Sequence, residues 1–542
     1  MTVTESKPEE VVPDLGAAPA QPALPPEPPS GIAGVLGTAD HKTVGRLYVG
    51  FSLLFLAAFL GTSTLVNAEA VDAGSLSVLN IDTFFQLQSL SQIGVVFLGL
   101  MPAFLGLALC VVPLQVGSPT VAFPRAAAAS FWGWLLGSGL LIAAYVGNGG
   151  PIGGNSDMVK LSFVAFAMVI LSLGLASVCV VTTVATARTR GMSLMRVPLF
   201  SWSMLVAGSM WLLNTAALLA NLLIVYIDTT HGQVLYGAAA NRWIQLTWIF
   251  AQPAVLTFAL PLLGILGDAT AVATRIRPAR YGVSLGAIGA AGALTFGAYA
   301  QTAFNPALIT EALFVLQSLV VVLPLLALFG GIADSVRRGR IRPTSAFLVS
   351  VAGMLLLLGA AVAGGLYALE PLNLGFTVWG AGVGNAATAA AVAGIAAGVF
   401  HWGSKIWGHR VAEPLGKLVF LAVLAGGALY AAGQLIAGAN GQLPVLGDGT
   451  FDSVASNAEF GALLSTVGCA LLAVVTVLLI LAVLPAALRR GPKADADPWG
   501  GQTLEWATSS PPPRGNFLGP IAEVTSPSPL LDIREGAAKE IV

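Results

Sequence analysis

The chain has 542 residues, of which 56% are hydrophobic and only 9% are charged, and its mean hydropathy is +0.83. An ordinary soluble domain carries about a quarter charged residues, so this composition excludes that class and indicates a protein with many membrane-spanning segments. The formal net charge of −1 gives no indication of a nucleic-acid partner, and the lipid bilayer is the expected environment.

The first 40 residues are rich in Pro, Ala and Glu and lack the features of a signal peptide, so residues 1–40 are interpreted as a disordered cytoplasmic tail. Twelve apolar segments follow, each long enough to cross roughly 30 Å of hydrocarbon. They cover residues 45–67, 88–114, 127–147, 159–186, 200–226, 243–267, 279–301, 307–333, 345–368, 376–403, 415–437 and 460–488. The pattern predicts an all-α, polytopic membrane protein with a twelve-helix bundle over residues 41–488 and a C-terminal cytoplasmic tail over residues 489–542.

The basic residues gather in alternate loops. Lys and Arg stay on the cytoplasmic side during insertion, and of the 25 basic residues only Lys160 and Arg242 fall in loops predicted on the other side. Both termini are therefore expected in the cytoplasm. The three cysteines each lie inside an apolar segment without metal-ligand spacing, which favours small buried hydrophobic residues over a disulfide or a metal site.

Six motifs follow one another along residues 41–517. They are HKTVGRLY at 41–48, MPAFLG and VVPLQVGSPTVAFPR within 101–125, WIFAQPAVLTFALPLLGI at 248–265, AGVFHWGSKIWG at 397–408, and DPWGGQTLEWATSSPPPRGNF at 497–517. This series resembles subunit I of the heme-copper terminal oxidases, the cytochrome c oxidase subunit I family. The resemblance implies the twelve-helix fold of that family in the plasma membrane of a bacterium. It also implies an ancestral activity of cytochrome c oxidation with oxygen reduction and proton pumping.

That activity depends on imidazole ligands to two hemes and a copper ion. The resemblance places Ser91 and Gly384 where the low-spin heme ligands stand in the family, and Gly382 where the high-spin heme ligand stands. Neither serine nor glycine can supply those bonds. The resemblance also places Gln252, Gln301 and Thr302 at the three copper-ligand positions, and an amide or hydroxyl is a poor copper ligand beside imidazole.

The positions that carry protons in the family are replaced as well. The glutamate and tyrosine that follow the first copper histidine correspond to Ala254 and Leu256, the acidic mouth of one proton pathway to Thr120, and the lysine of the other to Leu328. The arginine pair that holds heme propionates corresponds to Val445 and Leu446, and the outer magnesium ligands to Leu374 and Gly375. The sequence therefore predicts no heme, no copper, no other cofactor and no catalytic residue.

The four histidines lie elsewhere, at His41, His231, His401 and His409. We expect them at a helix start, in an outer loop, and near the cytoplasmic end of the tenth helix, with surface or partner-contact roles.

Two hypotheses address the space that the hemes occupy in the family. The tenth segment is rich in small residues, including a Gly394 and Gly398 pair, so close packing with Leu and Phe from neighbours would fill the space. Alternatively, Gly380, Gly382 and Gly384 interrupt the helix and the space takes a new occupant, in which case Gln252, Gln301, Thr302 and Asn385 should converge on an open pocket. Glu311, predicted about two turns inside its helix, is interpreted as a structural or interface acid rather than a proton site.

The favoured interpretation is a noncatalytic paralogue of oxidase subunit I, an interaction or structural subunit beside other oxidase-like or respiratory membrane subunits. The alternative is a channel, carrier or lipid-binding protein that reuses the heme space. An active oxidase with rearranged ligands is disfavoured by the histidine positions.

Overall fold

A computed structural model of the protein describes residues 31–71, 78–232, 239–301, 306–444 and 455–540. The chain divides into two compact units, Met1–Thr38 and Ala39–Val542. The regular element described in the first unit is the short helix α1 (Ile32–Leu36). The second unit contains the long apolar helices that are described below.

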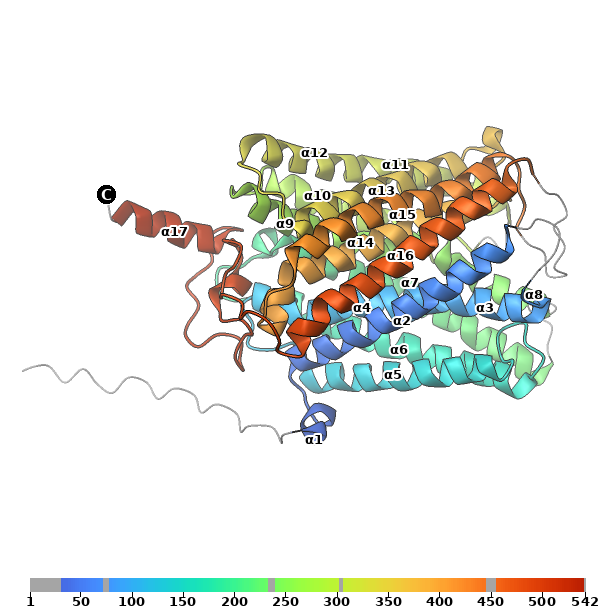
Figure 1. Ribbon diagram of the computed structural model, residues 1–542, viewed down its shortest axis with the longest axis horizontal. Helices are drawn as coiled ribbons and strands as arrows, with labels where there is room; N and C mark the ends of the chain where they lie inside the picture. Colours follow the sequence, from blue (N-terminus) through green and yellow to red (C-terminus); the bar gives the residue numbers. More distant parts are fainter. Residues whose placement is uncertain (1–30, 72–77, 233–238, 302–305, 445–454, 541–542) are drawn as a thin grey trace, which may run out of the picture. The chain divides into compact units, whose positions relative to one another are not determined.

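These helices lie side by side along one common direction (Figure 1). Eight of them are uninterrupted: α2 (His41–Glu69), α5 (Pro124–Val146), α6 (Ser156–Thr186), α7 (Leu199–His231), α13 (Ser345–Tyr367), α14 (Trp379–Trp407), α15 (Glu413–Ala439) and α16 (Ala458–Ala487). The most extensive helix contacts join α15 to α16, α13 to α14, and α5 to α6. The regular elements of the described residues are all helices, which confirms the predicted all-α membrane bundle.

Three further spans contain irregular turns. One joins α3 (Ile81–Ile93), the π-helical turn η1 (Gly94–Leu100) and α4 (Met101–Gln115). Another joins the 3₁₀ turn η4 (Ala254–Ala259) to α9 (Leu260–Thr274), and the third joins α11 (Ala312–Val320) to α12 (Val322–Arg338). Shorter elements connect the spans: η2 (Leu194–Arg196), α8 (Ala239–Ile244), η3 (Thr247–Phe250), η5 (Pro306–Thr310) and η6 (Glu370–Leu372). Two more, η7 (Leu504–Ala507) and α17 (Pro529–Glu540), follow the last span.

The count of twelve equal spans is not confirmed. Eleven helices of the described part are long and apolar enough to cross a membrane, and the predicted segment 279–301 forms only the 14-residue helix α10 (Tyr281–Leu294). The predicted segment 243–267 is not one helix either, because the 3₁₀ turns η3 and η4 interrupt it before α9 begins. Pro253, between two of those turns, has no N–H group with which to continue a helical hydrogen-bond ladder.

Two other predictions about helix geometry were wrong. Gly380, Gly382 and Gly384 do not interrupt the tenth segment, since α14 runs without a break from Trp379 to Trp407. Each glycine costs about 1 kcal/mol of helix propensity, and packing against the neighbouring helices offsets this cost. Glu311 is the N-cap of α11 and is exposed, so it does not lie two turns inside the helix.

The middle of α14 packs tightly against α4 and α9. A Cβ added to Gly394 would lie 2.9 Å from Cζ of Phe104 and 3.0 Å from Cβ of Leu262. One added to Gly398 would lie 2.8 Å from Cδ1 of Leu107 and 3.4 Å from Cδ1 of Ile265. Leucine and phenylalanine side chains from neighbouring helices therefore fill the space that these glycines leave.

Candidate functional site

A cavity of about 390 Å³, lined by both polar and apolar side chains, lies among the membrane spans. Its walls come from the end of α2, from α3 and η1, and from the first half of α14, the second half of α15 and the start of α16. Both Ser91 and Gly384 line it, so the two positions that the family resemblance assigns to low-spin heme ligands face one common space. Residues 489–540, which follow α16, are called the C-terminal segment, and they contact the start of α2 and the end of α14. The cavity lies toward the opposite ends of these helices.

Neither of these two positions presents a metal-binding group to the cavity. The Ser91 hydroxyl donates a hydrogen bond to the carbonyl oxygen of Gln88 at 2.9 Å, one turn back along α3. A Cβ added to Gly384 would find its nearest atom, the carbonyl oxygen of Phe250, at 3.4 Å. The neighbouring Asn385 also lines the cavity, and its amide donates to the carbonyl oxygen of Tyr430 at 3.1 Å.

Gly382 has different surroundings, although it lies only two residues from Gly384. A Cβ added to Gly382 would lie 2.7 Å from Cδ2 of Leu435 and 3.0 Å from its backbone nitrogen. Leu435 therefore covers the position that corresponds to the high-spin heme ligand. Nearby, the aromatic ring of Phe97 contacts those of Phe250 and Phe258 edge-on, at centroid distances of 6.1 and 5.9 Å.

The two copper-ligand positions that the structure describes, Gln252 and Gln301, form hydrogen bonds with different helices. Gln252 is buried, and its amide donates to the carbonyl oxygen of Gly364 at 2.8 Å and to the Ser318 hydroxyl at 3.4 Å. Gln301 lies beside α7 instead, with its side-chain oxygen 2.9 Å from the Asn221 amide. Thr302 falls outside the described residues, as do Val445 and Leu446. Neither Gln252 nor Gln301 lines the cavity that contains Asn385.

Three of the four positions assigned to proton transfer hold buried apolar side chains, and the fourth is the half-buried Thr120. Ala254, Leu256 and Leu328 are buried in the core. Ser118 donates to the carbonyl oxygen of Thr120 at 2.6 Å, and Tyr367 donates to that of Gly375 at 2.8 Å. Leu374, at the other outer metal position, is also buried.

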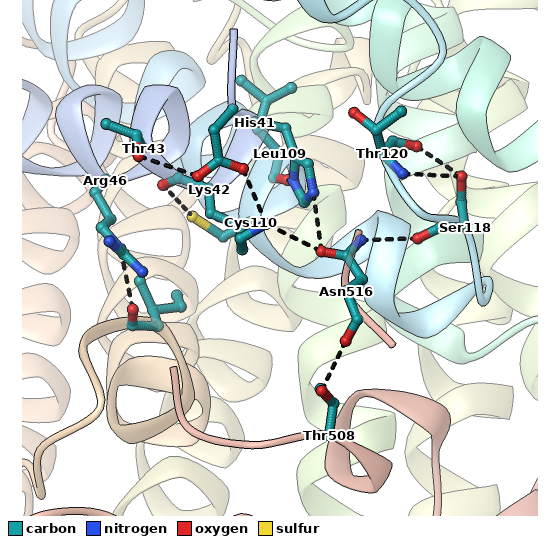
Figure 2. A network of polar contacts seen from close by, with 12 residues as sticks. His41, Lys42, Thr43, Arg46, Leu109, Cys110, Ser118, Thr120, Thr508 and Asn516 are labelled. Carbon is teal, nitrogen blue, oxygen red and sulfur yellow. Dashed lines mark hydrogen bonds and ion pairs between the residues drawn. The ribbon is translucent and has the colours of Figure 1, made fainter. Parts of the chain in front are cut away.

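A surface or partner-contact role was expected for the histidines, but two of the four are buried within this chain, although His41 does lie at a helix start as predicted. His41 is buried at the start of α2, with Nδ1 2.6 Å from the carbonyl oxygen of Leu109 and Nε2 3.2 Å from Oδ1 of Asn516 (Figure 2). His401 is buried edge-on against the rings of Trp402 and Trp506. Burial by the C-terminal segment explains both cases, because that segment packs on the end of the bundle.

The other two histidines are not in the core. His231 is exposed at the end of α7. His409 lies beyond the end of α14, where it forms a β-bridge with Lys493 and its side chain is half-buried. No group of three His, Cys, Asp or Glu side chains in the described part of the chain is arranged to hold a metal ion.

Pattern analysis missed a buried polar network beneath the C-terminal segment. The Gln115 amide nitrogen donates to Asp268 at 2.8 Å and to Glu505 at 3.0 Å, and Glu505 also accepts from the Trp402 indole at 3.2 Å. Glu505 belongs to the TLEW motif, so this motif provides a buried acceptor for two helices. The sequence contained a signal in Asp268, an acid at the end of an otherwise apolar segment.

Lys405 is fully buried in the same region. Its ammonium group donates to the carbonyl oxygens of Ala496 and Thr508, both at 2.6 Å, and of Ser509 at 3.4 Å. It also lies 5.4 Å from the centroid of the Trp506 ring. Charged side chains this deeply buried require such partners, so Lys405 holds the C-terminal segment onto the end of α14.

The fold and these polar groups define a multi-pass helical membrane protein. Its own C-terminal segment covers one end of the helix bundle, and a cavity lies toward the other end. Residues 43–484 match the family model described as cytochrome c and quinol oxidase polypeptide I. The chain therefore belongs to this family, which confirms the resemblance to oxidase subunit I.

Several bacterial proteins are similar to this chain along most of their length. A putative cytochrome c oxidase subunit 1-beta of Streptomyces avermitilis is 29% identical, with 93% of this chain and 92% of that protein covered. Cytochrome c oxidase subunit 1 of Bacillus subtilis is 28% identical, with 89% and 80% covered. A chain of a solved heme-copper terminal oxidase dimer shares the fold, with a TM-score of 0.68, 15% identity, and coverage of 92% of this chain and 89% of that one.

The heme and copper groups that the family implies can be tested against the side chains present. Iron and copper in such sites need imidazole donors, whereas the assigned positions offer a hydroxyl bonded to its own helix, two glycines, and amides that bond to different helices. The described residues at these positions do not fit either group.

Proposed function

We propose that this protein is a subunit I-like membrane protein without heme or copper, which acts as a structural or interaction subunit of a respiratory or oxidase-type membrane complex. The observation that carries the proposal is the surroundings of Gly382 and Gly384, the two neighbouring positions that correspond to heme ligands in the family. Leu435 covers Gly382, while Gly384 faces a cavity with no imidazole.

The interaction role is supported by the motifs that this chain shares with its family. The motifs shared with the family lie largely at the end of the bundle where the C-terminal segment packs, and there they form specific contacts such as those of Glu505 and Lys405. These contacts hold a folded surface in place without any part in electron transfer. A surface of this kind suits stable association with other membrane subunits.

The test is a reduced-minus-oxidised optical spectrum with metal analysis on the chain separated from co-purifying subunits. We expect neither heme bands nor stoichiometric copper or iron. Stoichiometric heme would overturn the proposal. A parallel mild purification followed by chemical crosslinking and mass spectrometry should recover other respiratory membrane subunits, and recovery of the chain alone would remove the interaction role.

A second candidate function is small-molecule or lipid binding in the cavity. It is favoured by the polar lining around Asn385. A channel or carrier has less support, because Gln252 and Gln301 do not line the cavity that contains Asn385. In addition, the middle of α14 packs against Phe104 and Leu262.

A further inference from the structure

The described residues that line the cavity include many polar side chains but no charged one. None of the described side chains that line it is Asp, Glu, Lys, Arg or His. Six carboxamides line it instead: Asn67, Gln88, Gln92, Asn385, Gln434 and Gln442. An ionised ligand would have no opposite charge to compensate its transfer from water, so this lining selects against phosphate, carboxylate and ammonium groups.

Several of these polar groups have unused hydrogen-bonding capacity. Within the described part of the chain, the side chains of Gln88, Gln92, Thr388 and Gln434 make no hydrogen bond, and the oxygen of the Asn385 side chain accepts none. Polar side chains among membrane spans ordinarily pair with one another or with the backbone. These groups come from three helices, α3, α14 and α15, and all line the same cavity.

The backbone beside the cavity is also irregular. The π-helical turn η1 (Gly94–Leu100) begins two residues after Gln92, and its residues Val95 and Val96 line the cavity. Wide turns of this kind are rare and are frequently found at functional sites. Here the turn follows the residues Gln88, Ser91 and Gln92 that face the cavity.

The carboxamides also indicate the chemistry of the ligand. Each carboxamide offers two N–H donors and one carbonyl acceptor, so a ligand that only accepts would leave its oxygen unpaired. A hydroxyl group both donates and accepts and therefore pairs with either end of an amide. Apolar side chains, among them Phe84 and Phe250, supply contact area for the C–H faces of a ring.

We infer that the cavity binds a neutral, hydroxyl-rich group of sugar size, the uncharged headgroup of a glycosylated lipid or the free sugar. A volume of about 390 Å³ lies within the usual range of small-molecule sites, roughly 300–1,000 Å³. The inference rests on the proposal that no heme fills this space, and heme content is measured separately by the optical spectrum. A failure of either proposal can therefore be recognised by itself.

The test uses the full chain in phosphatidylcholine nanodiscs prepared without glycoside detergents. Binding of octyl-β-glucoside is measured by calorimetry below its critical micelle concentration, with empty nanodiscs as the blank. Octyl phosphate, which has the same alkyl chain and a charged headgroup, is the comparison. We expect saturable binding of the glucoside, at least tenfold tighter than that of the phosphate. Methyl-β-glucoside distinguishes the two sources: equal affinity identifies a free sugar, and weaker affinity identifies a lipid headgroup.

The variant Gly384→Leu should fill the cavity, since a Cβ at this position meets nothing closer than 3.4 Å. We expect it to weaken glucoside binding at least tenfold. The matched control is Gly359→Leu on α13, where the glycine is exposed and a Cβ meets no atom within 4 Å. Gln92→Leu, which removes one unpaired amide, should weaken binding about fivefold without lowering the apparent Tm. Non-saturable binding, equal binding of octyl phosphate, or unchanged binding by Gly384→Leu would overturn the inference.

Discussion

The carboxyl groups of Asp268 and Glu505 accept hydrogen bonds from the same amide nitrogen, that of Gln115. They are separated by more than 200 positions in the chain and belong to a membrane helix and to the C-terminal segment. Asp268 also accepts from the backbone N–H groups of Leu199 and Phe200 at the start of α7. Together with the Trp402 indole, which donates to Glu505, the network joins the helices α4, α7, α9 and α14 to the TLEW motif.

The first prediction concerns the charge on Glu505. Burial raises the pKa of Glu505, against the opposing effect of hydrogen bonds such as those from Gln115 and Trp402. The stabilising contribution of the protonated Glu505 carboxyl is fully present below its ordinary pKa of 4.5. This contribution is lost as the pH rises through the higher pKa of the folded state. Glu505→Gln stays neutral at every pH. We expect its apparent Tm to exceed that of the wild type at pH 8, with a difference that shrinks toward pH 5.

The control for this experiment is Glu523→Gln, because Glu523 belongs to the same segment and is exposed. Its apparent Tm should follow the wild type at both pH values. A difference for Glu505→Gln that grows on acidification would contradict the assignment of a buried carboxyl with a raised pKa.

The second prediction concerns Lys405. Lys405→Met keeps the apolar stem but leaves the carbonyl oxygens of Ala496, Thr508 and Ser509 without their donor. Each such buried group costs about 1–3 kcal/mol. We expect a lower apparent Tm and faster thermolysin cleavage within residues 489–540. Lys417→Met, at an exposed position on α15, should change neither quantity, and equal effects of the two variants would argue against the anchoring role.

The third prediction concerns Asn516, which connects the C-terminal segment to two regions of the bundle. Its side-chain oxygen accepts from Lys42 at 3.2 Å, and its amide donates to the carbonyl oxygen of Ser118 at 2.7 Å (Figure 2). Its φ of +70° also favours asparagine over alanine. Asn516→Ala should destabilise the segment by about 2–4 kcal/mol. Limited proteolysis should detect the release, whereas Leu518→Ala, at a residue that is 80% exposed, should behave as wild type.

The fourth prediction concerns the contact of Gly394 with Phe104. Gly394→Ala should lower the apparent Tm, because its methyl group would lie 2.9 Å from the phenylalanine ring. Overpacking of this kind costs about 1–3 kcal/mol. In the double variant Gly394→Ala, Phe104→Leu, the smaller side chain should restore part of the loss. A double-mutant cycle measures the coupling, and strictly additive effects would show that the two residues do not compete for the same space.

Much of the fold could be predicted because membrane insertion depends on local properties of the sequence. Apolar length alone located the spans, and ordered motifs from His41 to Phe517 identified the family. The errors occurred where prolines or long-range packing decide the geometry. The segment around Pro253 forms 3₁₀ turns, and α14 stays helical through Gly382 and Gly384 because its neighbours pack against it.

For the candidate site too, some properties could be predicted from the sequence and others depend on the fold. The sequence by itself determined which side-chain chemistry is possible at each position, since serine, glycine and glutamine keep their donor properties in any fold. Only the tertiary structure decided which positions face open space. Leu435 covers Gly382 and Gly364 accepts from Gln252, while Ser91 and Gly384 line one cavity. The physical reason is that a cavity is a property of the side chains around it, and these come from helices far apart in the sequence.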